Sequence, residues 1–309
     1  MMGLLFTLLE IILSFISVSV LYLISIKPRT HGRPDYKPFF GHMYAHRGLH
    51  NMNPAIQKLK NIGHSLGQQP ETESKPADTE EKLPENSYAA IKRAADLGYG
   101  IEFDVHLTKD DIPVVFHDDT LNRICGVRGN LRDYTYEELQ QFRLLGTEER
   151  IPAFADILKM VDGRVPLIIE YKVEKNADKL CRICDSILSD YKGLYCIESF
   201  HPLAVRWYKI HRPHIVRGQL SEDFTRQKLN IPYFLLSHLI GNCYASPDFI
   251  AYNCKHRNEL SRNICRKFYK SLSVAWTVRS QEELDRVSRS FDLFIFEDFV
   301  PAEQRENCS

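Results

Sequence analysis

The sequence has little that points to a nucleic-acid partner or to a disulfide-stabilised secreted domain. Its 40 basic and 40 acidic residues leave a formal net charge of zero, so no overall positive field favours nucleic acid. Eight cysteines in 309 residues are too few for a disulfide scaffold, and a reducing compartment fits them better. An anionic ligand must therefore be recognised by locally placed arginine and lysine residues.

Common nucleotide and zinc motifs are also missing. The sequence contains no G-x-G-x-x-G motif and no Walker loop, which removes the usual support for a nucleotide-binding sheet. Its single C-x-x-C, formed by Cys181 and Cys184, has no second pair to complete a zinc site. We expect most of the cysteines to be small buried side chains.

One long apolar run is present, over residues 3–26, and its length matches a bilayer-spanning helix. A cleaved signal peptide is the alternative, but no Lys or Arg precedes the run and no small-x-small cleavage site follows it. The basic residues that follow directly are Lys27, Arg29, Arg33 and Lys37. Because basic residues concentrate on the cytoplasmic flank, we expect a single-pass membrane protein with its globular part in the cytoplasm.

The sequence divides into a transmembrane helix over residues 1–26, a proline-containing linker over 27–40 and one large domain over 41–302. Within that domain, residues 51–83 are polar and show no sustained period, so they indicate an irregular insertion. The insertion begins near candidate site residues and is either a lid or a solvated loop. The lack of an apolar stripe favours the loop.

The large domain alternates between strand and helix patterns, which favours a parallel sheet with helical crossovers. Candidate strands are 42–45, 99–106, 112–118, 166–171, 194–199, 215–220, 249–253, 273–278 and 293–297. Candidate helices are 84–97, one that starts at Thr135 with Glu138 three residues later, 153–161, 177–190, 202–211, 255–269 and 281–289.

Nine strand candidates are one more than a closed eight-stranded barrel needs. The turn between residues 106 and 112 is too short for a parallel crossover, which takes a dozen or more residues. One strand of that pair therefore lies outside the barrel. We predict a TIM (β/α)8 barrel with a small hairpin, preceded by one transmembrane helix. An open doubly wound sheet is the alternative.

Paired acids on one strand give the first chemical signal. Glu102 and Asp104 are two residues apart, so in a strand they share a face at a spacing of about 7 Å. Side-by-side carboxylates repel, and a divalent metal is the partner that best relieves the repulsion. An exposed face with two solvated acids is the alternative, but the apolar flanks of the strand weaken it.

Further polar residues stand where other predicted strands end, which is where such barrels place their active sites. These residues are His46, Arg47, His117, Glu170 and Lys172. Together with the paired acids they supply three carboxylates for a metal, two histidines for proton transfer and two cations for an anion. This set is what hydrolysis of a phosphodiester requires.

These residues also resemble a known family. Seven segments, in order over residues 42–301, are similar to glycerophosphodiester phosphodiesterase domains. They are His46-Arg-Gly48, Pro84-Glu-Asn-Ser87, Glu102-Phe-Asp-Val105, Thr108-Lys-Asp110, Pro113-Val-Val-Phe-His-Asp118, Glu170-Tyr-Lys172 and Ser199-Phe200. The resemblance implies a metal-dependent barrel hydrolase that releases an alcohol and sn-glycerol 3-phosphate from glycerophosphodiesters.

By matching positions, the resemblance assigns roles. It implies that Glu102, Asp104 and Glu170 bind Mg²⁺ or Ca²⁺, that His46 and His117 form the acid–base pair, and that Arg47 and Lys172 hold the phosphate. It also places Glu85 in the site and implies that a glycerol hydroxyl of the substrate is the nucleophile. His106, His201, His211 and His214 are expected to be structural, while Trp276 either lines the pocket or belongs to the core.

One segment departs from the family pattern, which usually has Thr-Asp-x-Pro after the last strand. Here the chain has Ile295-Phe-Glu-Asp-Phe-Val-Pro301, so Glu297 or Asp298 is the candidate substitute. The leading hypothesis is a membrane-anchored hydrolase of deacylated phospholipid head-group diesters. Two alternatives stay open: a lysophospholipase D, which the membrane anchor favours, and an inactive membrane-tethered binding module.

Overall fold

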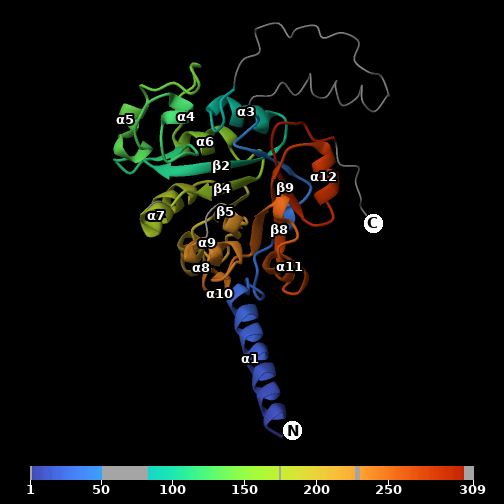
Figure 1. Ribbon diagram of the computed structural model, residues 1–309. Coiled ribbons are helices and arrows are strands. Elements are labelled where there is room, and N and C mark those ends of the chain that lie inside the picture. The colour runs from blue at the N-terminus through green and yellow to red at the C-terminus, as the bar shows by residue number, and fades with distance from the viewer. Residues whose placement is uncertain (1, 51–82, 174, 227–229, 303–309) are drawn as a thin grey trace.

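Figure 1 shows the computed structural model of the protein, which describes residues 2–50, 83–173, 175–226 and 230–302. A barrel forms the globular part, and helix α1 (Met2–Ile26) projects from one side of it. The predicted insertion over residues 51–83 lies outside the described residues, apart from Leu83.

Among the described residues, eight strands close the barrel, and all eight neighbouring pairs are parallel. They are β1 (Met43–His46), β2 (Gly100–Leu107), β4 (Leu167–Tyr171), β5 (Tyr195–Ser199), β6 (Arg217–Ser221), β7 (Phe249–Asn253), β8 (Leu272–Val278) and β9 (Leu293–Phe296). The predicted TIM barrel is confirmed. Because β1 pairs with both β9 and β2, the alternative of an open doubly wound sheet is wrong.

The surplus strand is β3 (Pro113–Val115), which pairs antiparallel with β2 and lies outside the closed ring. The turn between β2 and β3 is too short for a parallel crossover, so the two strands form an antiparallel hairpin, as predicted. Val114 and Phe116 belong to a separate apolar cluster, so the hairpin is anchored by its own small core.

Helices cover the outside of the barrel. They are α3 (Tyr88–Asp96), α4 (Asn122–Cys125), α5 (Tyr136–Leu139), α6 (Phe154–Val161), α7 (Ala177–Leu188), α8 (Pro202–His211), α9 (Ile231–Ser237), α10 (Asn242–Ala245), α11 (Leu260–Lys267) and α12 (Gln281–Val287). Short 3-10 turns are η1 (Lys37–Phe39), η2 (Leu131–Asp133), η3 (Phe224–Arg226) and η4 (Cys254–His256). Most of the predicted helices are confirmed to within a few residues, among them the capping box of Thr135 and Glu138.

Two helix predictions need correction. The helix predicted from residue 84 begins at Tyr88, because Ser87 is its N-cap and accepts a hydrogen bond from Ala90 N. The helix predicted over 255–269 is two elements, η4 and α11, because Asn253 caps the first of them separately. The prediction also omits α9 and α10, whose short apolar sequences lack a helical period.

Two apolar layers organise the barrel. One fills its interior and includes Tyr44, Ile168 and Phe249, while the other lies between the strands and the outer helices. Cys181 and Cys184 are fully buried in the outer layer, as expected for structural cysteines. Since side chains alternate along a strand, inward positions that follow the interior layer point into the mouth of the barrel.

The end of α1 is attached to the barrel. Gly241 N donates a hydrogen bond to Ser25 O at 3.1 Å, and the Tyr269 hydroxyl donates to Leu23 O at 2.9 Å. Residues Leu4–Ile26 have a mean hydropathy of 2.4 over the best window, enough for a membrane span or a signal sequence. The apolar helix thus emerges next to α10.

Candidate active site

Three buried carboxylates meet at the mouth of the barrel. Strand register places Glu102 beside His46 and Asp104 beside Glu170. One oxygen each from Glu102, Asp104 and Glu170 lies within 4.8 Å of the others. The side chains that the sequence places on separate strands therefore form one acidic cluster.

The electrostatics of this cluster are uneven. Burial raises the pKa of Glu102 well above its ordinary value, and neighbouring acids add to the effect. Burial also raises the pKa of Glu170. The pKa of Asp104 is held low, against burial, by Lys172, His117 and Arg47. A divalent cation bound between these carboxylates would relieve the repulsion that remains among them.

Lys172 joins two of the acids. Its Nζ lies 2.9 Å from Asp104 Oδ1 and 2.6 Å from Glu170 Oε1. Burial lowers the pKa of Lys172, but the two carboxylates outweigh it and raise that pKa overall. Lys172 is therefore charged and faces the acidic cluster.

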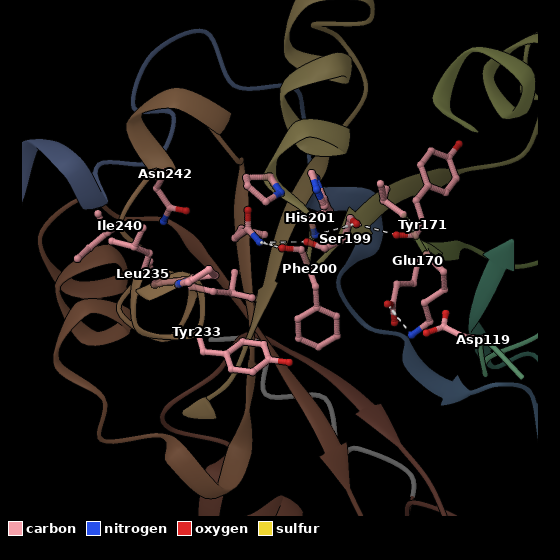
Figure 2. A pocket seen from close by; sticks show the side chains of 18 residues that line it. Asp119, Glu170, Tyr171, Ser199, Phe200, His201, Tyr233, Leu235, Ile240 and Asn242 are labelled. Carbon is pink, nitrogen blue, oxygen red and sulfur yellow. Dashed lines mark hydrogen bonds and ion pairs between the residues drawn. The ribbon is translucent and has the colours of Figure 1, made fainter. Parts of the chain in front are cut away.

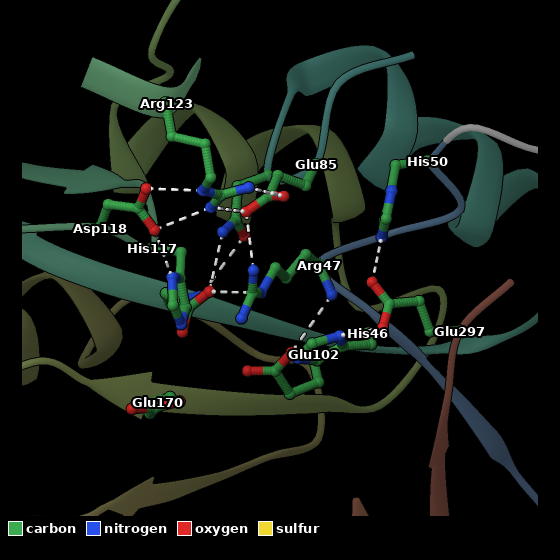
Figure 3. A network of polar contacts seen from close by, with 12 residues as sticks. His46, Arg47, His50, Glu85, Glu102, His117, Asp118, Arg123, Glu170 and Glu297 are labelled. Atoms are coloured by element: carbon green, nitrogen blue, oxygen red, sulfur yellow. Dashed lines mark hydrogen bonds and ion pairs between the residues drawn. The ribbon is translucent and has the colours of Figure 1, made fainter. Parts of the chain in front are cut away.

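Arg47 links the acidic cluster to a second network (Figure 3). Its Nη1 lies 2.7 Å from Glu85 Oε1, and its Nε lies 3.4 Å from Asp104 Oδ2. Arg123 continues the network, with Nη1 at 2.7 Å from Glu85 Oε2 and Nη2 at 2.7 Å from Asp118 Oδ1. Glu85 thus accepts hydrogen bonds from two guanidinium groups, from Arg47 at Oε1 and from Arg123 at both oxygens.

His117 is oriented by its neighbour in sequence. Its Nδ1 lies 2.6 Å from Asp118 Oδ1, while its backbone carbonyl contacts His106 Nε2 at 3.1 Å. Arg123 and His117 hold the pKa of Asp118 well below its usual range. The ionised carboxylate of Asp118 accepts a hydrogen bond from the N–H group at Nδ1 of His117. Nε2 is therefore the nitrogen of His117 that is available for proton transfer.

His46 lies on the other side of the cluster. Its Nε2 is 3.9 Å from Glu102 Oε2, and its Nδ1 is 3.4 Å from Glu297 Oε2. Burial lowers the pKa of His46 to about 4 despite these carboxylates. Of the two candidates after the last strand, Glu297 is the one that contacts His46, whereas Asp298 faces Arg279 at 3.7 Å.

Glu297 also places His50 in the site, with its Nε2 at 3.2 Å from Glu297 Oε1. His50, Asn86, Asp118 and Arg123 are not among the predicted site residues, although they contact them. Asn86 Nδ2 donates to Asp104 Oδ2 at 2.8 Å. Asn86 directly follows Glu85 and Asp118 directly follows His117 in sequence. Their position next to predicted site residues could have identified them.

A fourth acid, Glu198, is also missing from the prediction. It follows Cys196 on the inward face of β5, and strand register places it beside Glu170. Its side chain is 1% exposed, and its Oε2 has no hydrogen-bond partner among the described residues. Alternate side chains of the predicted strand 194–199 point inward, and this rule could have identified Glu198.

These residues fit a divalent cation. Oxygen ligands from carboxylates are what Mg²⁺ and Ca²⁺ prefer, and an unpartnered buried carboxylate oxygen is costly without a compensating charge. Glu102, Asp104 and Glu170 provide the converging oxygens, and Glu198 adds an acidic group beside them.

We expect Glu198→Gln to stabilise the metal-free protein at neutral pH by about 1–3 kcal/mol. Burial raises the pKa of Glu198 in the folded state, so folding destabilises the ionised form that the unfolded chain adopts above its ordinary pKa. The gain is therefore present at pH 7 and disappears as the pH falls below that ordinary pKa. Thermal unfolding of the full-length protein checks it.

The same experiment has a metal arm. Mg²⁺ or Ca²⁺ should raise the melting temperature of Glu198→Gln less than that of the unchanged protein, because one compensated charge is gone. Glu148→Gln is the matched control, since the Glu148 side chain is 93% exposed. Equal melting temperatures for both variants in the absence of metal would contradict an uncompensated Glu198.

Trp276 lies at the border between core and mouth. It packs against the interior apolar cluster, and its ring meets that of Phe200 edge to face at 5.7 Å. Phe200 in turn lines a cavity beside Glu170. Of the two open interpretations, packing in the barrel interior describes the position of Trp276 better.

Comparisons with known proteins agree with this geometry. Residues 46–290 match the glycerophosphoryl diester phosphodiesterase family. A glycerophosphodiester phosphodiesterase from Caldanaerobacter subterraneus subsp. tengcongensis is 30% identical over 152 residues, which cover 45% of this chain and 62% of the relative. One from Bacillus altitudinis is 30% identical over 156 residues, covering 47% and 64%. The matched segments thus span less than two thirds of these relatives.

Solved structures share the fold. An Oleispira antarctica phosphodiesterase in complex with the product sn-glycerol-3-phosphate has a TM-score of 0.60 and 20% identity, covering 84% of this chain and 93% of its own. A glycerophosphodiester phosphodiesterase from Thermotoga maritima has a TM-score of 0.56 and 20% identity, covering 82% and 93%.

Proposed function

The chain belongs to the glycerophosphoryl diester phosphodiesterase family, and we propose that it hydrolyses glycerophosphodiesters to an alcohol and sn-glycerol 3-phosphate. The observation that carries the proposal is the acidic cluster of Glu102, Asp104 and Glu170, with His46 at the end of β1 and His117 just after β3. The named activities of the relatives and the product bound to the Oleispira protein support the same reaction.

The three clustered carboxylates would hold Mg²⁺ or Ca²⁺, which when bound supplies positive charge near the phosphate oxygens. Arg47 and Lys172 would bind the phosphate, since both point their charged groups at the cluster. A phosphate oxygen can replace part of their present carboxylate contacts without leaving either cation unpaired.

The two histidines suit different roles. Burial lowers the pKa of His46 to about 4, so this side chain is neutral at pH 7 and can accept a proton from the nucleophile. The carboxylate of Asp118 holds His117 at Nδ1 and so orients the imidazole, which leaves Nε2 to exchange a proton with the substrate. We therefore assign proton abstraction to His46 and proton donation to the leaving alkoxide to His117.

An inactive membrane-tethered module is the alternative from another class. A binding module has no need of two histidines that each pair with a separate carboxylate, Glu297 and Asp118. The full-length protein incubated with glycerophosphocholine or glycerophosphoethanolamine should release sn-glycerol 3-phosphate. Absence of release in Mg²⁺, Ca²⁺ and Mn²⁺ would overturn the enzymatic assignment.

We also propose that α1 spans a membrane with the barrel on the cytoplasmic side, as the basic residues after the helix predict. A reporter enzyme fused after Ser309 should be active only if it is one that works in the cytoplasm. Activity of a reporter that works only outside the cytoplasm would reverse the orientation. Recovery of a protein shortened by its N-terminal segment would instead indicate a signal sequence.

A further inference from the structure

The end of α1 is fixed to the barrel by hydrogen bonds and by burial. The Tyr269 hydroxyl donates to Leu23 O at 2.9 Å, and Gly241 N donates to Ser25 O at 3.1 Å. Ile26, the last residue of the apolar span, is fully buried in the outer apolar layer. The span therefore meets the surface of the barrel directly, without a polar spacer.

Asn242 connects this junction to the interior of the domain. Its Nδ2 donates to Ile26 O at 3.3 Å, and its buried side chain also lines a cavity of about 530 Å³. Figure 2 shows Asn242 at one end of that cavity and Glu170 at the other. Because the residue that holds α1 is itself packed inside the domain, α1 cannot tilt away from the barrel without breaking these contacts.

The chain after α1 continues along the barrel. Arg29 Nη1 donates to Pro213 O at 2.8 Å, and Arg33 Nη2 donates to Tyr269 O at 2.8 Å. Pro213 precedes β6 and Tyr269 precedes β8, so both arginines bind close to where strands begin. If α1 spans a bilayer, these contacts hold the barrel at the level of the lipid head groups.

The segment Lys267-Phe-Tyr-Lys270 lies beside the end of α1 and combines aromatic with basic side chains. Phe268 is 68% exposed, and Lys267 and Lys270 are exposed as well. Among the described residues, no acid pairs with either lysine. Exposed aromatic rings and lysines next to an apolar span are typical of the layer where a membrane meets water.

A second group of such side chains lies on α8 and α10. Figure 1 shows these helices on one side of the end of α1 and α11 on the other. Tyr244 is 48% exposed, and the guanidinium of Arg206 lies 3.8 Å from the centre of its ring. Lys209 Nζ donates to Tyr244 O at 3.2 Å. Basic and aromatic groups therefore border α1 on both sides.

We propose that these two groups form a collar that binds the head groups of anionic phospholipids and seats the barrel on the bilayer surface. The collar consists of Arg206, Lys209, Tyr244, Lys267, Phe268 and Lys270. It rests on the proposed membrane span of α1 and is independent of the hydrolytic reaction. Each lysine or arginine close to an anionic membrane surface strengthens binding about fivefold.

Fluorescence from an added tryptophan locates the collar. Full-length protein with Phe268→Trp is placed in nanodiscs of phosphatidylcholine and phosphatidylglycerol, in which a small fraction of the lipids carries a nitroxide on the head group. We expect the nitroxide to quench the fluorescence that this variant adds to that of the unchanged protein. Leu97→Trp is the matched control, because Leu97 is 51% exposed and follows α3, on the opposite side of the barrel from α1. Its added fluorescence should not be quenched.

The same tryptophan tests the preference for anionic lipid. At equal mole fractions, phosphatidylglycerol with a nitroxide near the top of its acyl chain should quench Phe268→Trp more strongly than phosphatidylcholine labelled at the same position. Adding Lys267→Gln and Lys270→Gln should reduce this preference by up to about fivefold for each lysine. Lys92→Gln with Lys159→Gln is the control, since these exposed lysines lie on α3 and α6. It should leave the preference unaltered.

The outcomes separate this proposal from the others. Equal quenching at positions 268 and 97 would overturn the collar and leave the membrane span and the hydrolase standing. Equal quenching by the two lipids, with no effect of the lysine variants, would overturn the binding of anionic head groups. Recovery of the full-length protein outside the nanodiscs would overturn the span and the collar together. Lack of turnover, by contrast, would overturn the hydrolytic function alone.

Discussion

Replacement of His117 by alanine is expected to lower kcat for glycerophosphodiesters by about 10²–10⁴-fold, the usual contribution of a positioned acid or base. The imidazole is held at Nδ1 by Asp118, 2.6 Å away. Alanine removes the proton donor for the leaving alkoxide and leaves the three clustered carboxylates in place. Steady-state release of sn-glycerol 3-phosphate measures the effect.

His46→Ala should produce a loss of the same order for the opposite reason, because it removes the group that takes a proton from the nucleophile. The two variants differ in their response to the leaving group. A substrate whose leaving alcohol is acidic, such as a nitrophenyl phosphodiester, needs little protonation and should restore much of the activity of His117→Ala. It should not restore His46→Ala.

Folding must be separated from catalysis in both cases. Far-ultraviolet circular dichroism and melting temperatures of the variants should match those of the unchanged protein, since neither side chain belongs to an apolar core cluster. His31→Ala is the matched control, because His31 is exposed in the segment after α1. A loss of less than tenfold in either histidine variant would contradict the acid–base assignment.

Removal of divalent metal is expected to lower turnover by about 10²-fold or more, because a Lewis acid in a hydrolase contributes several kcal/mol to the transition state. Treatment with EDTA followed by dialysis should produce this loss, and Mg²⁺ or Ca²⁺ should reverse it. Glu102→Gln should then raise the metal concentration needed for half-maximal activity by at least about 10–100-fold.

The affinity for metal should increase with pH. Burial raises the pKa values of Glu102 and Glu170 above their ordinary range in the metal-free protein. A metal binds the ionised forms, so binding releases protons and weakens as the pH falls through the raised pKa values. Calorimetric titrations in two buffers of different ionisation enthalpy would measure this release.

Two results would contradict the ligand assignment. One is full activity in EDTA, and the other is an unchanged metal titration for Glu102→Gln. Glu149→Gln is a suitable control, because Glu149 is an acid outside the cluster that accepts a hydrogen bond from Ala89 N. It should leave the metal requirement unaltered.

Strand alternation made much of this site predictable. Glu102 and Asp104 share a face because they are two residues apart on a strand. Lys172, one residue past the end of β4, lies on the same side as Glu170. The short turn before β3 required one strand to lie outside the ring. These are local rules of backbone geometry, so they act on the sequence without knowledge of the tertiary fold.

Other features depended on contacts between distant segments. Glu297 rather than Asp298 meets His46 because β9 pairs with β1 and brings the end of one strand beside the end of the other. Glu198 joins the acids through the register between β4 and β5. No local pattern specifies which of two adjacent acids, Glu297 or Asp298, faces His46, which is 251 residues before Glu297.

By itself, the sequence therefore determined the barrel, the order of its strands and most of the charged residues at its mouth. Only the tertiary structure decided the partners of those residues and the cavity between Glu170 and Asn242. That cavity is bounded by α9 and α10, two short helices without a helical period in sequence. The cavity exists because α9 and α10 pack against the barrel and α1. A periodic sequence pattern does not predict such packing.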